Sequence, residues 1–120
     1  MTPPARPLRD RVGAAVERDT LAAERRALEA TEFQKTVARD LGQLLEEEVD
    51  PLTVVQHGYL NRYYQGSVQR YGLEFRGHYQ FSGDTRYHLC GGWQVVRRRR
   101  LRRTQTRNVH RLSQLEGWVR

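Results

Sequence analysis

YGLEFR, residues 71–76, is the stretch that decides the fold. Large apolar side chains stand at every second position, at Tyr71, Leu73 and Phe75, with small or charged residues between them. Successive side chains of a β-strand point to opposite faces of the sheet, so this period of two predicts a strand with one buried face. The same pattern suggests that strand structure begins near residue 68.

Downstream of this strand, Ser82-Gly83-Asp84 is typical of a turn. A returning strand is predicted by the large apolar residues that follow, interrupted by Gly91 and Gly92. We therefore expect strands within residues 68–97, arranged as a β-hairpin or a small antiparallel sheet with a kink or bulge. The apolar residues of the returning strand are Tyr87, Leu89, Trp93, Val95 and Val96.

The segment before the strands predicts helices. Residues 10–48 are rich in Ala, Leu, Glu and Arg and contain no proline. Apolar residues recur there at spacings of three and four, which places them on one stripe of an amphipathic helix. This stripe needs a partner, which is either the core of the domain or, alternatively, a second helix or a dimer seam. The stripe comprises Phe33, Val37, Leu41, Leu44 and Leu45, extended backwards by Leu21 and Leu28, with Asp19 or Thr20 as the N-cap.

Two further helices are expected. Pro51 after Asp50 is typical of a first helical turn, and apolar residues up to Tyr64 predict a helix over residues 51–65. A basic C-terminal helix over residues 98–116 is predicted by apolar residues that lie three apart. These are Val109, Leu112 and Leu115.

The whole chain, residues 1–120, predicts a single α+β domain. Its N-terminal amphipathic helices occupy residues 10–65, a β-hairpin or small antiparallel sheet follows, and a short helix ends it. Residues 1–9 contain three prolines and predict a flexible tail. Because only 38% of the residues are hydrophobic, the core should be thin, and dimerisation would stabilise it.

The charge balance favours a polyanionic partner. Lys and Arg total 21 against 14 Asp and Glu, which gives a formal net charge of +7. Lys35 is the only lysine, so nearly every positive charge is a guanidinium that pairs bidentately with phosphate, although codon bias is an alternative cause of the imbalance. The arginines around Leu101 predict salt-dependent phosphate binding, with a nuclear-import signal or a solvated surface as alternatives. These arginines are Arg97, Arg98, Arg99, Arg100, Arg102 and Arg103.

Nothing in the sequence points to catalysis. The histidines are not accompanied by HExxH, a Gly-rich phosphate loop, GxSxG or CxxC. His88 and Cys90 lie on one strand face and could bind a metal with His78 or His110, but the paired spacings of a four-ligand site are absent. We therefore expect a protein that is not an enzyme and needs neither a cofactor nor a metal.

Cysteine content and hydropathy indicate a cellular compartment. Cys90 is the sole cysteine, so no intrachain disulfide can form, and a reducing, intracellular setting is the simplest one. No apolar run approaches the roughly 18 residues of a membrane span, and the first ten residues lack the apolar stretch of a secretory signal. We expect a soluble protein without membrane contact.

Aromatic residues gather in the second half of the chain, between Tyr59 and Trp118, and arginines are interleaved with them. Such a surface can stack on unpaired bases while its guanidinium groups bind phosphates, although half of the aromatics should belong to the core. The interleaved arginines are Arg62, Arg70, Arg76 and Arg86.

Residues 71–90, YGLEFRGHYQFSGDTRYHLC, resemble the central strands of the tombusvirus nineteen-kilodalton RNA-silencing suppressors. The pattern of that family has three parts. The first is Tyr, any residue, an aliphatic residue, any residue and Phe-Arg-Gly. The second, a few residues later, is Ser-Gly, any residue, a hydroxyl residue and Arg, and the third is His-Leu-Cys. Residues 61–64, NRYY, are similar to the small-Arg-aromatic-aromatic stretch before those strands. The resemblance covers residues 61–90, and the short aureusvirus relatives of the family are closer to this chain in length.

The resemblance implies a viral suppressor of RNA silencing that binds and sequesters double-stranded RNA, including siRNA, whatever its sequence. It implies a homodimer whose joined sheets cover the phosphates and 2′-hydroxyls of an A-form duplex. The host cell cytoplasm is the implied location, with the nucleus as a second one. Ser82 and Thr85 would donate hydrogen bonds to the RNA, and Arg76 and Arg86 would be framework or phosphate-binding residues.

The chain departs from the family at several positions. Gly72 and Glu74 stand where the family offers hydroxyl and basic side chains, and a carboxylate beside phosphate is repulsive unless it is paired. No tryptophan precedes Trp93, so the family's length-measuring tryptophans have no counterpart, and longer duplexes become candidate ligands. The Gly-Trp pairs at Trp93 and Trp118 are candidates for Argonaute contact or base stacking, with a structural role as the alternative.

Two other functions remain open from the sequence. The first is a helical protein-interaction module in which the arginine run is a nuclear-localisation segment. The second is a small DNA-binding regulator that uses residues 97–115 as a recognition helix. Salt dependence and duplex preference distinguish these functions from double-stranded RNA binding.

Overall fold

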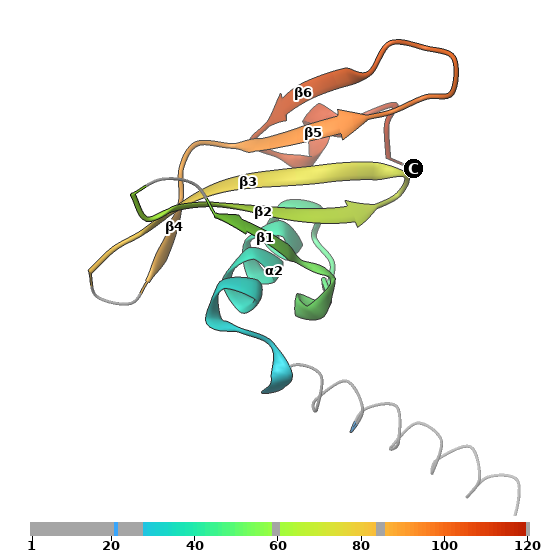
Figure 1. Ribbon diagram of the computed structural model, residues 1–120. Coiled ribbons are helices and arrows are strands. Elements are labelled where there is room, and N and C mark those ends of the chain that lie inside the picture. The colour runs from blue at the N-terminus through green and yellow to red at the C-terminus, as the bar shows by residue number, and fades with distance from the viewer. Residues whose placement is uncertain (1–20, 22–27, 59–60, 84–85, 120) are drawn as a thin grey trace, which may run out of the picture.

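A six-stranded antiparallel sheet dominates the computed structural model, which describes residue 21 and residues 28–58, 61–83 and 86–119 (Figure 1). The strand order is β1-β2-β3-β5-β6, and β3 pairs with β5 along its first half and with β4 along its second. The elements are α2 (Glu32–Leu45), η1 (Pro51–Thr53), β1 (Val55–Gly58), β2 (Tyr63–Arg70), β3 (Leu73–Phe81), β4 (Tyr87–Leu89), β5 (Trp93–Arg97), β6 (Gln105–Val109) and η2 (Leu112–Leu115).

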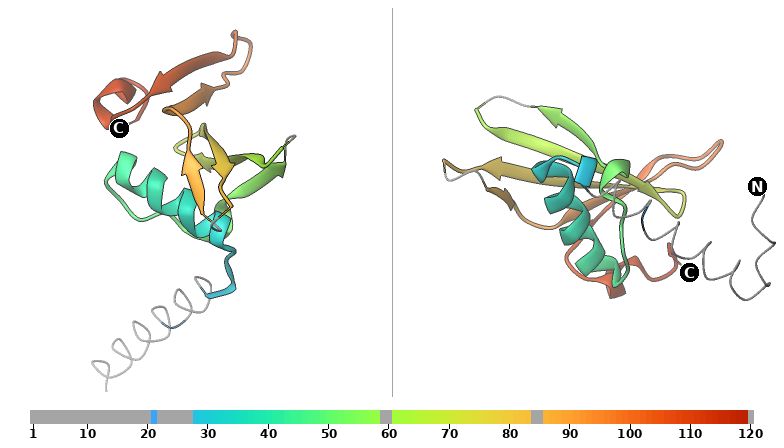
Figure 2. Two further views of the ribbon diagram at one scale, coloured as in Figure 1. Left: turned by 90° about the vertical axis from the view of Figure 1, so that its left-hand side faces the viewer. Right: turned by 90° about the horizontal axis from the view of Figure 1, so that it is seen from below.

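Helix α2 packs against one face of the sheet (Figure 2). Its apolar stripe is buried from Phe33 to Leu45, as the spacing of three and four predicts. Thr31 caps the helix: its hydroxyl accepts from the Gln34 backbone N–H at 3.1 Å, and the Gln34 side chain accepts from the Thr31 N–H at 3.0 Å. Leu21 and Leu28 are exposed and do not extend the buried stripe, and the predicted cap at residues 19 and 20 lies outside the described residues.

The hairpin of β2 and β3 is the centre of the sheet. Leu73 and Phe75 are buried on the helix side, which confirms the predicted strand. Tyr71 and Gly72 form the two-residue turn and both have positive φ, 56° and 69°, as expected where two strands reverse direction this tightly. Tyr71 therefore lies outside the strand, and its hydroxyl donates to the Glu47 carboxylate beyond the end of α2.

The core lies between α2, η2 and one face of the sheet. Gly66 and Gly77 pair directly across β2 and β3, and both face this core. A Cβ built on Gly66 would lie 2.7 Å from a Val37 methyl, so the absence of a side chain lets α2 approach the sheet.

Tyr79 is fully buried, and its hydroxyl donates to Asp40 at 2.8 Å. Burial raises the pKa of the Tyr79 phenol, and the Asp40 carboxylate adds to this, so the hydroxyl keeps its proton.

This architecture corrects the expected α+β fold of several helices and a small sheet. Residues 51–65 are not a helix: the Asp50 cap and Pro51 start only the short turn η1, and then β1 and part of β2 follow. Residues 98–116 are not a helix either, because β6 pairs with β5 there and only η2 is helical. Val55, Tyr64 and Val109, which were part of the helical patterns, lie in β1, β2 and β6, so tertiary pairing overrides the local pattern there.

Candidate nucleic-acid interface

The sheet has a second face, turned away from α2 and η2, which we call the open face. Along each strand it is formed by the residues between those that point into the core. No helix of the described residues lies on it (Figure 2). The open face comprises Val55 and His57 of β1, Tyr63, Gln65, Ser67 and Gln69 of β2, Glu74, Arg76, His78 and Gln80 of β3, Gln94 and Val96 of β5, and Thr106 and Asn108 of β6.

Amide and hydroxyl groups cover most of this face. The strand register places Ser67, Arg76, Gln94 and Asn108 in one row across β2, β3, β5 and β6. The next row toward the end of β3 places Gln65 between His57 and His78. Gln65 donates to the Ser67 hydroxyl at 3.0 Å, and both are buried beneath their neighbours. The exposed amide and hydroxyl groups of this face, which can donate and accept hydrogen bonds, are those of Gln69, Gln80, Thr106 and Asn108, with Gln94 half-buried among them.

Glu74, the carboxylate on this face, is paired with two arginines. Arg76 donates to its two oxygens at 2.7 and 3.1 Å, and Arg98 donates to one of them at 2.7 Å. These hydrogen bonds, led by those from Arg76, lower the pKa of Glu74 to about 2 despite its burial. The carboxylate is therefore ionised at any physiological pH, and two guanidinium groups balance its charge.

Acid should weaken this cluster. A carboxyl whose pKa is lower in the folded protein than in the unfolded chain stabilises the fold above its ordinary pKa, 4.5, and this stability is lost as the pH falls toward about 2. We expect the free energy of unfolding of the wild type to drop by about 1–2 kcal/mol more than that of Glu74→Gln across that range. Urea unfolding followed by tryptophan fluorescence at several pH values measures the difference. Parallel acid profiles of the two proteins would contradict the pairing.

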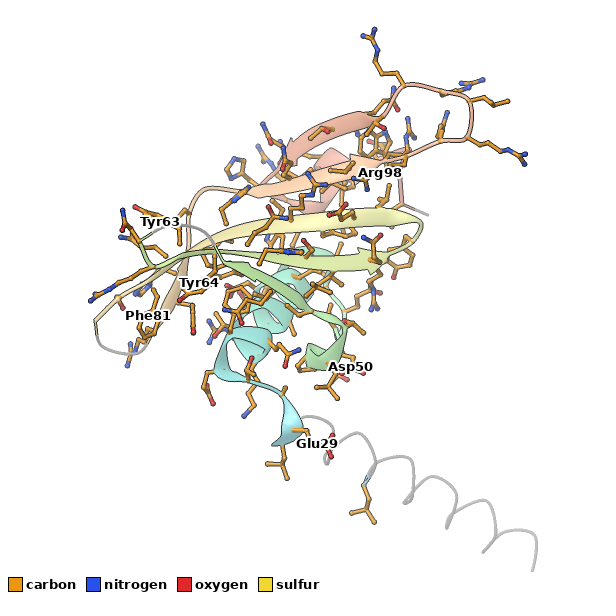
Figure 3. All side chains as sticks on the ribbon, in the orientation of Figure 1. Glu29, Asp50, Tyr63, Tyr64, Phe81 and Arg98 are labelled. Carbon is orange, nitrogen blue, oxygen red and sulfur yellow. The ribbon has the colours of Figure 1, made fainter. Side chains whose placement is uncertain are left out.

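The longest loop between paired strands of the described residues carries several exposed arginines. The β5–β6 hairpin runs past the start of β3, whose first residue pairs with the last residue of β5. Residues 98–104 form its connection, which we call the arginine loop. Nitrogen-tipped side chains spread outward around it (Figure 3), and Leu101 at its tip is 98% exposed with φ 61°. Its four tip arginines, all exposed, are Arg99, Arg100, Arg102 and Arg103.

Two other predicted arginines lie on the helix side. Arg70 donates to the Glu47 carboxylate at 2.8 Å and to the Glu48 carbonyl at 3.2 Å, and the hydrogen bond to Glu47 raises the pKa of Arg70. Arg97 donates to Gln105 and stacks on the Trp118 ring, with 4.4 Å between its guanidinium carbon and the ring centre. Partial burial lowers the pKa of Arg97, and Arg99, Arg107 and Arg102 add to this effect. Both arginines are committed to structural contacts.

The two tryptophans are also engaged. Trp93 is only 3% exposed and packs edge-on against Tyr79, which leaves no ring face for a base. Trp118 is held between Arg97 and Arg107, whose guanidinium carbon lies 4.2 Å from the ring centre. These positions favour the structural alternative for both Gly-Trp pairs.

The remaining predicted residues gather at the opposite end of β3. The Ser82 hydroxyl donates to the Arg86 carbonyl at 3.2 Å and lies 3.1 Å from His88 Nε2. Arg62 is exposed before β2, and its carbonyl accepts from the Phe81 N–H at 2.8 Å. Arg86 is exposed, whereas Thr85 lies outside the described residues. Arg62, Ser82 and Arg86 therefore lie near the end of β3, whereas Arg98 and the tip arginines lie near its start. Arg70 and Arg97 lie on the helix side and belong to neither group.

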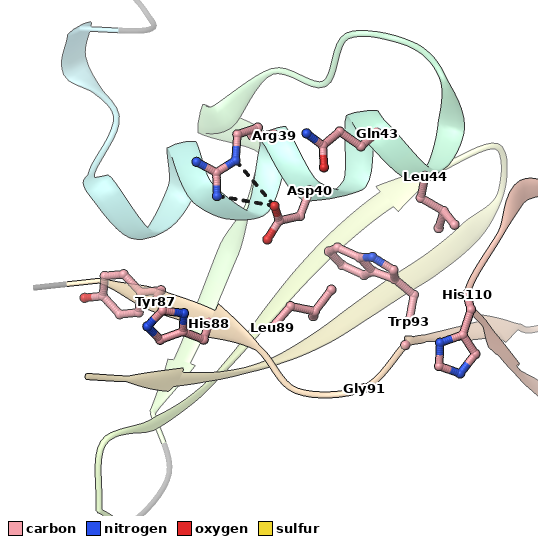
Figure 4. A pocket seen from close by; sticks show the side chains of 11 residues that line it. Arg39, Asp40, Gln43, Leu44, Tyr87, His88, Leu89, Gly91, Trp93 and His110 are labelled. Atoms are coloured by element: carbon pink, nitrogen blue, oxygen red, sulfur yellow. Dashed lines mark hydrogen bonds and ion pairs between the residues drawn. The ribbon is translucent and has the colours of Figure 1, made fainter.

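A pocket lies elsewhere, beside α2 (Figure 4). It has a volume of about 520 Å³ and is lined by Arg39, Asp40, Trp93 and His110, among others. Asp40 is already engaged by Arg39 and Tyr79. Across the described part of the chain, no three His, Cys, Asp or Glu side chains converge as metal ligands.

Sequence reasoning missed the polar members of the open face. Gln65, Ser67 and Gln69 alternate with core residues, as do Thr106 and Asn108. Such alternation indicates which residues share a face only when the segment is first recognised as a strand. The helices predicted over residues 51–65 and 98–116 hid the alternation at Gln65, Thr106 and Asn108. Ser67 and Gln69 lie outside those ranges.

Comparison with known proteins adds no relative, because no family model, no curated protein and no solved structure matches this chain. None of the helices in the described residues has the length and apolar character needed to span a bilayer.

Proposed function

We propose that this protein binds double-stranded RNA in a sequence-independent way and, as a viral suppressor of RNA silencing, sequesters siRNA. The observation that carries the proposal is the open face: a polar surface continuous across the sheet, adjoining a loop with four exposed arginines. The resemblance of residues 61–90 to the tombusvirus suppressors points to the same ligand.

The chemistry of the open face matches an A-form duplex. The minor groove of such a duplex is wide and shallow and displays 2′-hydroxyls, which side-chain amides and hydroxyls can bind without reading bases. Gln94, Thr106 and Asn108 offer such groups on β5 and β6, next to the arginine loop. Guanidinium groups of the loop would bind the flanking phosphates and release counterions.

The proposal includes a homodimer in the host cytoplasm. One open face carries few rows of polar residues, so two copies would cover more of a duplex. The engaged states of Trp93 and Trp118 mean that this protein would not measure duplex length with exposed tryptophans, and duplexes longer than siRNA are proposed as ligands too.

The direct test measures binding of the purified protein to a 21-base-pair RNA duplex, its separated strands and the matching DNA duplex across a salt series. We expect tight binding to duplex RNA alone, weakening steeply with salt, and equal affinity for unrelated RNA sequences. Equal binding to the DNA duplex would contradict recognition of A-form geometry. No binding to any ligand at low salt would refute the proposal.

A further inference from the structure

Glu74 accepts hydrogen bonds from two guanidinium groups at the open face, those of Arg76 and Arg98. Its side chain is 11% exposed, whereas those of Arg76 and Arg98 are 28% and 57% exposed. Arg76 lies two residues along the same strand, and Arg98 lies at the base of the arginine loop, two residues beyond Val96. The carboxylate is thus the buried centre of the cluster, and Arg98 is its most accessible member.

Arg76 and Arg98 form a site for an anion, and the Glu74 carboxylate of the protein itself occupies it. A guanidinium fork from β3 and one guanidinium nitrogen from the arginine loop converge on a group with two oxygens, and arginines bind the two oxygens of a phosphodiester in the same way. The residues that pair with Glu74 on the neighbouring strands are Gln69 and Val96, and neither carries a charge. Among these three paired residues, Glu74 alone carries a charge that opposes a phosphate.

We propose that Glu74 is an internal counter-ion that occupies a two-arginine phosphate site, and that a backbone phosphate of duplex RNA competes with it for Arg98. This inference rests on the proposed function. In the free protein, Glu74 keeps Arg76 and Arg98 oriented and ties the base of the arginine loop to β3. On binding, Arg98 turns to the phosphate while Arg76 stays on the carboxylate. Glu74 thus limits the affinity for RNA while it organises the site.

The test compares Glu74→Gln with Glu47→Gln. Both variants add the same charge to the protein, but Glu47 pairs with Arg70 and Tyr71 on the helix side of the sheet. We expect Glu74→Gln to bind the 21-base-pair RNA duplex about five- to tenfold more tightly at low salt, because a negative charge beside the phosphate is removed. Its plot of log affinity against log salt should steepen by about one. Glu47→Gln should change affinity less than about twofold, with the same salt slope as the wild type.

A double variant and inorganic phosphate test the same site independently. In Glu74→Gln/Arg98→Ala, the gain in affinity should disappear relative to Arg98→Ala alone. Sodium phosphate, compared with sodium chloride at equal ionic strength, should raise the melting temperature of Glu74→Gln more than that of Glu47→Gln. If the wild type binds RNA and the two glutamine variants behave alike, the counter-ion proposal is overturned and the proposed function stands. If no protein binds RNA, the proposed function fails, and the phosphate comparison alone decides the role of Glu74.

Discussion

Replacing all four tip arginines with alanine is expected to weaken binding to duplex RNA by about 100- to 1,000-fold near 0.1 M salt. Each phosphate contact contributes about 0.9 to the slope of log affinity against log salt, so losing three or four contacts should flatten that slope by about three. The tip arginines are exposed and lie outside the sheet, and the substitutions should leave the fold intact. Fluorescence anisotropy with a labelled RNA duplex over a salt series measures both quantities.

A matched control distinguishes the effect of the arginine loop on RNA affinity from the effect of net charge. Arg102→Ala/Arg103→Ala removes two charges from the loop, and Arg39→Ala/Arg111→Ala removes two exposed charges from α2 and from the residue before η2. The loop pair should lose about tenfold or more in affinity, whereas the control pair should lose less than about threefold. Equal losses would mean that overall charge, and not the arginine loop, attracts the RNA.

Gly66→Val should be the most destabilising single substitution on the helix side of the sheet, at about 3 kcal/mol. A Cβ at this position would lie 2.7 Å from one Val37 methyl and 3.3 Å from the Phe33 ring, both held by α2. The added side chain would have to push the helix off the sheet, and overpacking of this kind is costly. Urea unfolding followed by tryptophan fluorescence gives the change in free energy.

The neighbouring strand supplies the control for this substitution. Gly58 in β1 is exposed, and a Cβ there would meet only a Tyr64 ring carbon at 3.9 Å, so Gly58→Val should change stability by less than about 0.5 kcal/mol. Combining Gly66→Val with Val37→Ala should cost less than the sum of the two single changes, because the smaller side chain makes room. Strict additivity would show that Gly66 and Val37 are not in contact.

The sequence identifies elements whose local pattern and tertiary partner agree. The stripe from Phe33 to Leu45 has helical spacing and packs as a helix, and Leu73 and Phe75 alternate and pair as a strand. Gly91 and Gly92 interrupt the returning strand as expected and separate β4 from β5. In each of these segments, local preference and long-range packing favour the same structure.

The sequence predicts the wrong element where local preference and long-range packing favour different structures. Val109, Leu112 and Leu115 have helical spacing, but Val109 ends β6, and only Leu112 and Leu115 share a short helical turn. The prediction of site residues failed for a similar reason. Arg70 and Arg97 look like other arginines in the sequence, yet strand parity turns them toward the helix side, where Glu47 and Trp118 engage them. Side-chain direction on a strand depends on register, which a single sequence does not state.

The burial of Leu115 beside α2 has a consequence for how the chain is made. Leu115 shares one core with Phe33 and Leu41, although the whole sheet separates them in sequence. At about 5–20 residues per second, the ribosome releases α2 several seconds before it releases Leu115. The nascent protein therefore carries an incompletely covered apolar helix during this interval, and its core is complete only after η2 has been synthesised.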